Sequence, residues 1–254
     1  MQKLERTTFE TSRAAEYFTA EGLTKLTEQS AENFGDVVIK ELGDNALDAS
    51  ETADVVPELL ISCERRGELT DISISDNGEG IPPKTVESMQ NFATLTSDKA
   101  HYRSPTRGAQ GNALKTIIGI PHALGVGSEP VIIEGRGVRH TIKPVIDAAG
   151  VPRLPRKVEA SERTTGTKVT ASLPEDRIEL DPFHWGRAFA MFNPYAFIKI
   201  EQFDEGTEQK VNGFRKWVDF INRPLNRLAS TSQTIGAALT GTTRRRLGRL
   251  SART

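Results

Sequence analysis

The side chains best suited to chemistry in this sequence are Glu41, Asn45 and Asp48, which stand at positions i, i+4 and i+7. Apolar residues recur at helical spacing around them, so all three are expected on one face of a helix over residues 32–52. A carboxylate can polarise a water molecule, and an amide oxygen can help complete the octahedral oxygen shell of Mg²⁺. Taken alone, such a face is more often a solvated polar stripe.

A strand and a tight turn would position a second acid, Asp76. The alternating residues 72–75 predict a strand that ends at Asp76, and Gly78 and Gly80 follow it. Glycines let a backbone approach a ligand closely, and an adenine amino group would suit the acid. The alternative for this stretch is an ordinary hairpin turn.

Two further stretches favour a nucleotide site over those alternatives. In residues 104–116, Gly108 and Gly111 precede a helical pattern, so backbone N–H groups and the positive end of a helix dipole would face a phosphate. Residues 164–167, Thr-Thr-Gly-Thr, precede an alternating strand and add hydroxyl groups where a base could dock.

These four stretches resemble, in the same order, the motifs of the GHKL superfamily of ATPases, which includes gyrase B, heat-shock chaperones, MutL proteins and sensor histidine kinases. Within it the chain is most similar to the B subunits of type IIB topoisomerases (topoisomerase VI), over roughly residues 10–200. Asp48 argues against a sensor kinase, whose equivalent helix normally lacks that acid. The matching segments are 14–18, 41–51, 97–99, 107–111 and 193–196.

The resemblance implies that ATP and Mg²⁺ are the ligands. Glu41 would be the general base, Asn45 the Mg²⁺ ligand and Asp76 the adenine contact. The relatives tend to have Gly-x-Gly where this chain has Gly111-Asn112-Ala113, so either the phosphate loop bends differently or Ala113 is already helical. The remaining nucleotide contacts would be Asp48, Gly78, Gly80, Ile81, Ser97, Lys99, Arg107, Gly108, Gln110, Gly111, Asn112, Ala113 and Thr167.

Two classes of function stay open. The first is an ATPase whose hydrolysis drives dimerisation or partner switching in DNA topology or DNA metabolism, as a homodimer or with a DNA-cleaving topoisomerase A-type subunit. The second is a nucleotide switch with little hydrolysis, or a truncated subunit, because topoisomerase B subunits continue into a transducer domain whose lysine reaches the γ-phosphate. Lys99 or Lys115 could replace that lysine, although both are more often surface residues. A sensor-kinase-like module is less favoured, because no helical hairpin with a phosphoacceptor histidine precedes Glu41.

Composition excludes several other classes of protein. The single cysteine, Cys63, excludes an internal disulfide framework and suggests a reducing compartment. The four histidines are far apart, so a zinc site has no support. The sequence shows neither an apolar signal segment nor a run of eighteen apolar residues, so we expect a cytoplasmic protein that does not enter a membrane.

The charge is unevenly distributed along the chain. Residues 214–254 contain nine Lys or Arg and one Asp, whereas residues 1–213 contain 24 basic and 33 acidic residues. A basic tail can bind DNA phosphates, fold back on its acidic domain or stay solvated. The last two are favoured slightly, because Arg244-Arg245-Arg246 has no interleaved aromatic residues for stacking.

The pattern of elements predicts an α+β fold. It is a two-layer α/β sandwich of the Bergerat ATP-binding type, with a mostly antiparallel sheet and helices on one face. We expect an ATP-binding domain over 1–213 and a basic, disordered tail over 214–254. A charged turn is expected over 64–68, and a loop with one edge strand over 144–165. Helices are expected over 12–28, 32–52, 83–92, about 108–122 and 183–192, and strands over 59–63, 71–75, 131–134, 139–143, 168–173 and 196–201.

Overall fold

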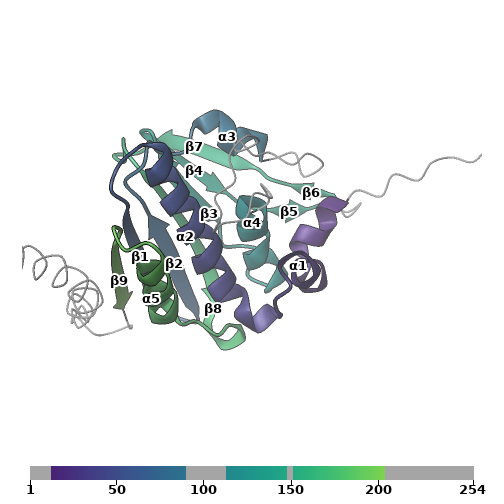
Figure 1. Ribbon diagram of the computed structural model, residues 1–254. Helices are drawn as coiled ribbons and strands as arrows, with labels where there is room; N and C mark the ends of the chain where they lie inside the picture. Colours follow the sequence, from purple (N-terminus) through teal and green to yellow (C-terminus); the bar gives the residue numbers. More distant parts are fainter. Residues whose placement is uncertain (1–12, 90–112, 148–150, 204–254) are drawn as a thin grey trace, which may run out of the picture.

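The computed structural model describes residues 13–89, 113–147 and 151–203. They form one seven-stranded sheet in the order β7-β4-β3-β8-β2-β1-β9, with a separate two-stranded ribbon, β5-β6 (Figure 1). All neighbours in the large sheet are antiparallel except β1 and β9, which are parallel. The strands are β1 Glu58–Arg66, β2 Leu69–Ser75, β3 Val131–Gly135, β4 Val138–Ile142, β5 Val145–Ile146, β6 Pro152–Arg153, β7 Arg156–Ala160, β8 Thr167–Pro174 and β9 Phe197–Phe203.

The helices cover one face of this sheet. The longest, α2, crosses it, packing against β1, β2 and β8 and against its neighbours α4 and α5 (Figure 1). This arrangement confirms the predicted α+β fold with two layers. The helical segments are η1 Arg13–Phe18, α1 Ala20–Thr27, η2 Ala31–Asn33, α2 Phe34–Thr52, α3 Pro83–Ser88, α4 Ala113–Ala123, η3 Glu175–Arg177 and α5 Pro182–Phe192.

The hydrophobic core lies between the helices and the sheet. On α2 the side chains of Phe34, Val38 and Ile39 are fully buried, while Ile61 and Ile72 meet them from β1 and β2. Each such burial contributes about 1.5–3 kcal/mol relative to an exposed side chain. The apolar periodicity therefore fixes the rotation of α2 about its axis, and with it the direction of the polar face.

The first predicted helix is divided in the structure. Residues 13–18 form a 3-10 helix, and α1 starts at Ala20 after Thr19, whose side chain caps it by accepting a hydrogen bond from Gly22 N at 3.1 Å. Gly22 also packs closely on η1, because a methyl group there would lie 2.2 Å from Glu16 O. The cap and this contact turn the chain where the periodicity predicts one continuous helix.

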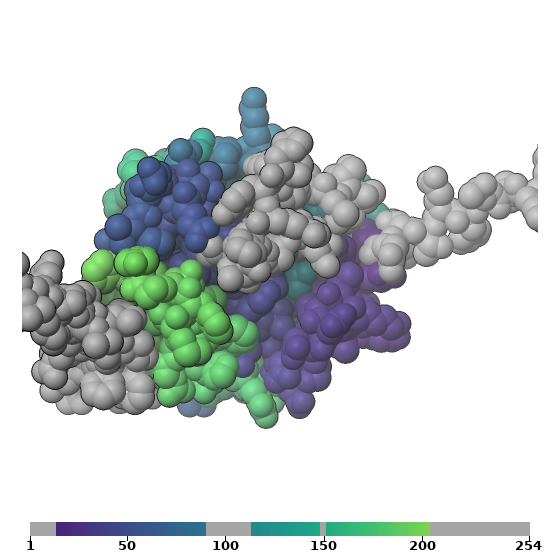
Figure 2. Space-filling view, viewed as in Figure 1, coloured from purple at the N-terminus to yellow at the C-terminus, as the bar shows by residue number. Residues whose placement is uncertain are grey.

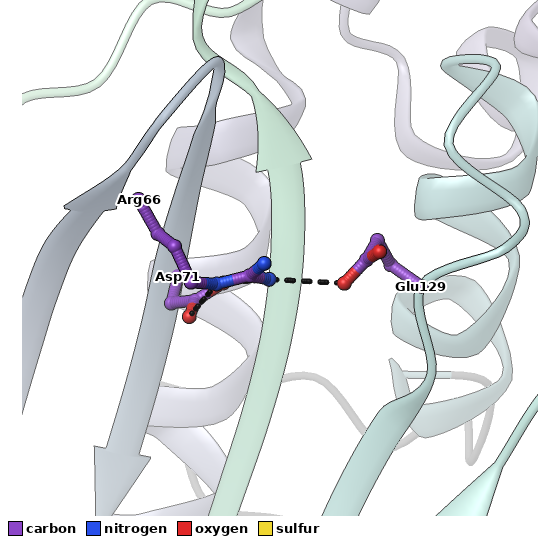
Figure 3. Close-up of polar contacts among 3 residues, drawn as sticks. All are labelled: Arg66, Asp71 and Glu129. Carbon is purple, nitrogen blue, oxygen red and sulfur yellow. Dashed lines mark hydrogen bonds and ion pairs between the residues drawn. The ribbon is translucent and has the colours of Figure 1, made fainter.

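The predicted charged turn over 64–68 was wrong, because β1 continues to Arg66 and only Gly67 and Glu68 separate it from β2. The guanidinium of Arg66 donates to both carboxylate oxygens of Asp71, at 3.0 and 3.2 Å, and to Glu129 at 2.9 Å (Figure 3). Exposed ion pairs of this kind contribute about 0–1 kcal/mol. Arg66 thus pairs with an acid in the same hairpin and with one in the segment before β3, so a charged residue at this position is compatible with a strand.

The predicted loop over 144–165 also contains more strand than expected. Arg156–Ala160 is the edge strand β7, paired with β4, and the short strands β5 and β6 pair only with each other. The other elements agree with the predicted ones within a few residues, as far as the structure describes them. No helix within the described ranges has both the length and the apolar character of a membrane span. The predicted tail over 214–254, and with it the domain boundary at 213, lies outside the described residues.

Candidate functional site

The polar face of α2 carries the three residues singled out by their spacing. Glu41 and Asn45 are partly exposed, whereas Asp48 is buried at 8% exposure. The helix is continuous from Phe34 to Thr52, so all three project toward the same side. The structure therefore places a carboxylate and an amide one helical turn apart at the surface, with a buried carboxylate one turn further on.

Glu41 has a cationic neighbour that its spacing did not predict. Lys40 Nζ lies 2.8 Å from Glu41 Oε1 and 3.3 Å from Asp44 Oδ2. Partial burial opposes a charge on Lys40, but the hydrogen bond to Glu41 and the charges of Glu41 and Asp44 outweigh it and raise the pKa of Lys40. Adjacent helical residues do not normally face each other, so a periodicity argument misses this pair.

Asp76 follows β2 and is joined to the start of β8. Its Oδ1 atom accepts hydrogen bonds from Gly78 N at 2.8 Å and Thr167 N at 3.1 Å, and its own N–H donates to Thr167 O. Burial raises the pKa of Asp76, and the two backbone hydrogen bonds oppose that shift. Both bonds end on Oδ1, so they fix the carboxylate without engaging Oδ2.

Close backbone packing completes the junction. Gly166 N donates to Gly78 O at 2.8 Å, and Ile81 N donates to the Thr167 hydroxyl at 3.1 Å. A methyl group on Gly78 would lie 2.8 Å from the backbone of Ala49 on α2, and one on Gly80 would lie 2.8 Å from Gly166 O. Three separate stretches of the sequence therefore meet beside the second half of α2, where only glycine fits at these contacts.

The start of α4 contributes a buried cation. Ala113 is the first residue of α4, which confirms that this position is helical. Lys115, in the first turn, is only 1% exposed, and burial lowers its pKa. It is therefore not the plain surface lysine that its residue type suggests. The predicted contacts Ser97, Lys99, Arg107, Gly108, Gln110, Gly111 and Asn112 lie outside the described residues.

Asn77 is a residue that sequence reasoning missed. Its Oδ1 atom accepts from Glu58 N at 3.0 Å and lies 2.9 Å from Ser50 Oγ, and its Nδ2 atom donates to Val56 O at 2.9 Å. It ties the end of α2, the start of β1 and the end of β2 together. An Asn-Gly pair after a strand indicates a turn, which hides this role.

Two arginines also contact the glycine-rich turn. Arg136 donates to Gly80 O at 2.9 Å and pairs with the Glu79 carboxylate at 3.0 Å. Arg163 Nη1 lies 3.5 Å from Asp76 O. No motif in the sequence pointed to either residue, because both act on backbone carbonyl groups.

The donor set suits Mg²⁺ held jointly with a phosphate group. Within the described ranges no cluster of three or more His, Cys, Asp or Glu could hold a metal ion by itself. Mg²⁺ usually keeps several waters and takes only one or two protein ligands besides phosphate oxygens. The amide of Asn45 on the exposed face of α2 meets that requirement.

Comparison with known proteins gives a consistent match. Residues 34–177 match the family described as histidine kinase-, DNA gyrase B- and HSP90-like ATPase. The chain is 26% identical to the B subunit of type 2 DNA topoisomerase 6 from Natronomonas pharaonis, over 65% of its own length and 21% of that protein. It is also 26% identical to the Archaeoglobus fulgidus protein of that name, over 74% of its own length and 31% of the relative. The chain thus spans a third or less of these relatives.

A similar solved structure is the ATPase region of Saccharomyces cerevisiae topoisomerase II, with a TM-score of 0.42 and 18% identity. The similarity covers 65% of this chain and 46% of that one.

Proposed function

The chain belongs to the histidine kinase-, DNA gyrase B- and HSP90-like ATPase family, and from this premise we propose that it binds ATP with Mg²⁺ and hydrolyses the ATP slowly. The site would lie between α2, the turn after β2 and the start of α4. Asp76 would accept a hydrogen bond from the adenine amino group through Oδ2. Gly78, Gly80, Ile81 and Thr167 would shape the base pocket. Asn45 would be the protein ligand of Mg²⁺, which would neutralise phosphate charge when bound.

One observation carries this proposal. Asp76, Gly78 and Thr167 are joined by short backbone hydrogen bonds and packed on α2 at Ala49, the residue after Asp48. This junction puts the proposed adenine contact next to the face that holds Glu41 and Asn45. The proposed base pocket and the proposed general base would therefore share one side of the molecule, at opposite ends of the polar face of α2.

Glu41 would act as the general base. Its carboxylate would take a proton from the attacking water and orient that water by hydrogen bonding. Asn45, one helical turn away, would hold the phosphate groups of ATP in position beside Glu41 through Mg²⁺. At the start of α4, the N–H groups and the buried Lys115 would supply positive charge where negative charge develops.

The test uses a substitution that removes the base and keeps its shape. We expect Glu41→Gln to retain ATP affinity by calorimetry and to lower single-turnover hydrolysis by on the order of a hundredfold or more. Glu51→Gln, an exposed position on the same helix, is the matched control and should change neither quantity. Unchanged hydrolysis in Glu41→Gln would show that another group activates the water.

A second candidate function is a nucleotide switch that holds ATP and hydrolyses it poorly. The ion pair between Lys40 and Glu41 favours it, because Lys40 Nζ occupies Glu41 Oε1, an oxygen that would otherwise be available to orient the attacking water. On this hypothesis Lys40→Met should raise single-turnover hydrolysis several-fold without changing ATP affinity. A fall in hydrolysis would instead make Lys40 a residue that positions Glu41.

We further propose that ATP binding drives association with partners in DNA topology or DNA metabolism. The support is the name of the matched relatives, which are B subunits of a DNA topoisomerase and so imply a second subunit. A second copy of this chain and a DNA-cleaving A-type subunit are the two partners proposed. Sedimentation of the purified chain with and without a non-hydrolysable ATP analogue would detect the first.

A further inference from the structure

The strand β7 forms one edge of the large sheet and is exposed along most of its length. Within the described residues it pairs with β4 alone, and Lys157, Val158, Glu159 and Ala160 are all exposed. Val158 stands opposite His140, a buried residue of β4, so both lie on the side of the sheet that the helices cover. The side chain of Val158 is nevertheless 51% exposed. The helical layer therefore leaves the middle of β7 open.

The backbone hydrogen bonds at the two ends of β7 show which of its polar groups point outward. Lys143 N donates to Pro155 O at 3.2 Å, and Ser161 N donates to Gly137 O at 2.8 Å. Both pairs continue the register of β4 with β7, in which hydrogen-bonded pairs alternate with pairs that are not bonded. The even-numbered residues of β7 therefore direct their N–H and C=O groups away from β4. They are Arg156, Val158 and Ala160.

These outward groups and the charges of β7 are self-complementary. If two β7 strands pair antiparallel about Val158, Val158 meets its own copy and Arg156 meets Ala160, so every outward N–H and C=O group has a partner. On the face of the sheet away from the helices, each Lys157 then lies opposite the Glu159 of the other copy. Within one chain the same two side chains already form an ion pair of 2.8 Å.

The charges also exclude the neighbouring registers. A pairing centred on Lys157 places that lysine opposite itself, and a pairing centred on Glu159 does the same for the acid. Like charges directly opposite each other are destabilising, whereas opposite charges and apolar pairs stabilise neighbouring strands. An edge that only had to avoid association would be better protected by charges of one sign. The order Lys157-Val158-Glu159 thus favours one antiparallel register of two copies.

The opposite edge of the sheet does not permit the same contact. Its strand, β9, also contains an ion pair, between Lys199 and Glu201, and lies with α5 in the green corner of the space-filling view (Figure 2). A methyl group on Gly186 of α5 would overlap the side chain of Ile200, so α5 packs directly over the middle of β9. Neighbouring strands lie about 4.8 Å apart, but packed helices need about 8–10 Å. Two copies joined through β9 would bring their α5 helices into overlap, whereas the exposed Val158 shows that no helix covers the middle of β7.

We propose that two copies of this chain associate by antiparallel pairing of β7 with β7 about Val158, which joins their sheets edge to edge. The contact uses none of the residues proposed to bind ATP, so it forms without nucleotide and is separate from the ATP-driven association proposed above. A pair of five-residue strands is smaller than the roughly 1,200 Å² of a stable protein interface. The dimer is therefore weak and reversible.

Exchanging the charges of β7 tests the register directly. By sedimentation of the nucleotide-free, 254-residue chain over a concentration series, we expect a dimer with a Kd below about 1 mM. Lys157→Glu and Glu159→Lys each place like charges opposite each other at both contacts, and each should raise the Kd by about 5- to 100-fold. An equal mixture of the two variants restores opposite charges at both contacts. It should form a heterodimer with about the affinity of the unmodified chain.

The matched controls are Lys199→Glu and Glu201→Lys, which change the ion pair at the other edge of the sheet and should leave the Kd unchanged. Glu159→Lys also places a lysine opposite Arg139 of β4, so the melting temperature of each variant is measured. If that variant does not fold, Val158→Pro replaces it. Proline there removes an outward N–H and no hydrogen bond to β4, so it should abolish the dimer and keep the fold.

Four outcomes would overturn the proposal. They are a chain that stays monomeric at about 1 mM, a dimer that appears only with a non-hydrolysable ATP analogue, charge exchanges on β9 that act as strongly as those on β7, and a mixture of the two β7 variants that stays monomeric. Where Val158→Pro is used, a dimer that survives this substitution would do the same. A failure to bind ATP would leave all of these measurements unaffected.

Discussion

Asp76 accepts two backbone hydrogen bonds on one carboxylate oxygen, so its roles in structure and in nucleotide recognition can be separated by substitution. In Asp76→Asn the amide oxygen can keep both bonds, while the amide nitrogen would face the adenine amino group as a second donor. We expect ATP affinity, measured by calorimetry, to fall by about 1–3 kcal/mol, roughly 5- to 150-fold. Discrimination against GTP should be lost, and the melting temperature should not fall.

The sign of the stability effect follows from the pKa. Burial raises the pKa of Asp76, so its ionised form is less favourable in the folded than in the unfolded state. This penalty is absent below the unfolded pKa and is fully present above the folded one. Asp76→Asn should therefore be at least as stable as the unmodified chain at pH 7, and the difference should vanish in acid. A lower melting temperature at pH 7 would contradict this interpretation.

Asn77 should matter for stability and not for recognition, because its side chain links three elements through Ser50, Val56 and Glu58. Asn77→Ala leaves these polar groups without their partner, and we expect the free energy of unfolding to fall by about 1–3 kcal/mol. Denaturant titration measures the change. Asn33→Ala, which removes only exposed side-chain contacts, is the control and should cost less than about 0.5 kcal/mol. Equal losses in both variants would refute the linking role.

At the scale of single residues, the sequence predicted what depends on periodicity and missed what depends on tertiary contact. The common face of Glu41, Asn45 and Asp48 follows from helical spacing, and the structure has it. The pair between Lys40 and Glu41 arises from side-chain conformations of adjacent residues. The contacts of Asn77 require the folded positions of segments about 20 or more residues away, which no local pattern contains.

Among the elements, the meeting of the turn after β2 with the start of β8 depends on Gly166. Its φ is +67°, and a methyl group there would lie 1.9 Å from Asp76 O. Gly67, in the β1–β2 hairpin, has a similar φ of +64°, but a methyl group there would meet no atom within 4 Å. The two glycines differ in crowding and share their backbone conformation.

We therefore expect Gly67→Ala to lower the free energy of unfolding by about 1–2 kcal/mol, the penalty for alanine in the left-handed region. Gly166→Ala should cost at least about 3 kcal/mol, since the backbone must also move, and it should weaken ATP binding through Asp76 and Thr167. Thermal unfolding and calorimetry on both variants test this expectation. Comparable stability of the two would mean that the junction adapts to the extra methyl group.

Element types were predictable here, but not how the elements end or pair. Alternation identified β1 and β2, yet the charged residues 64–66 continue β1, because exposed hairpin positions tolerate charge that pairs across the strands. The break between η1 and α1 depends on the cap at Thr19 and the contact of Gly22 with Glu16, which are tertiary features. The parallel pairing of β1 with β9 joins residues about 140 positions apart and has no sequence signature.

For the whole molecule, the charge asymmetry connects the fold with the partners proposed for it. The first 213 residues carry an excess of acidic side chains, while the 41 residues after them carry nine Lys or Arg and one Asp. Four of these nine basic residues lie between 215 and 227. The other five lie between 244 and 253. Basic charge is therefore concentrated in the sequence after residue 213, whereas the residues before it are acidic on balance.

Such a basic segment predicts DNA binding that does not depend on the DNA sequence. Neutralising phosphates releases counterions, so the logarithm of the binding constant should fall with the logarithm of salt concentration by about 0.9 per phosphate on duplex DNA. The chain truncated at residue 213 should lose this binding and keep its ATP affinity, because every ATP contact proposed here lies before Lys168. Gel-shift titrations at two salt concentrations, on the intact and truncated chains, measure both effects. A shift that survives truncation would place the DNA contact on the ATPase domain. The electrostatic attraction to DNA is strongest at low salt. No shift under those conditions would therefore mean that the basic residues contact the protein or one of its partners instead of DNA.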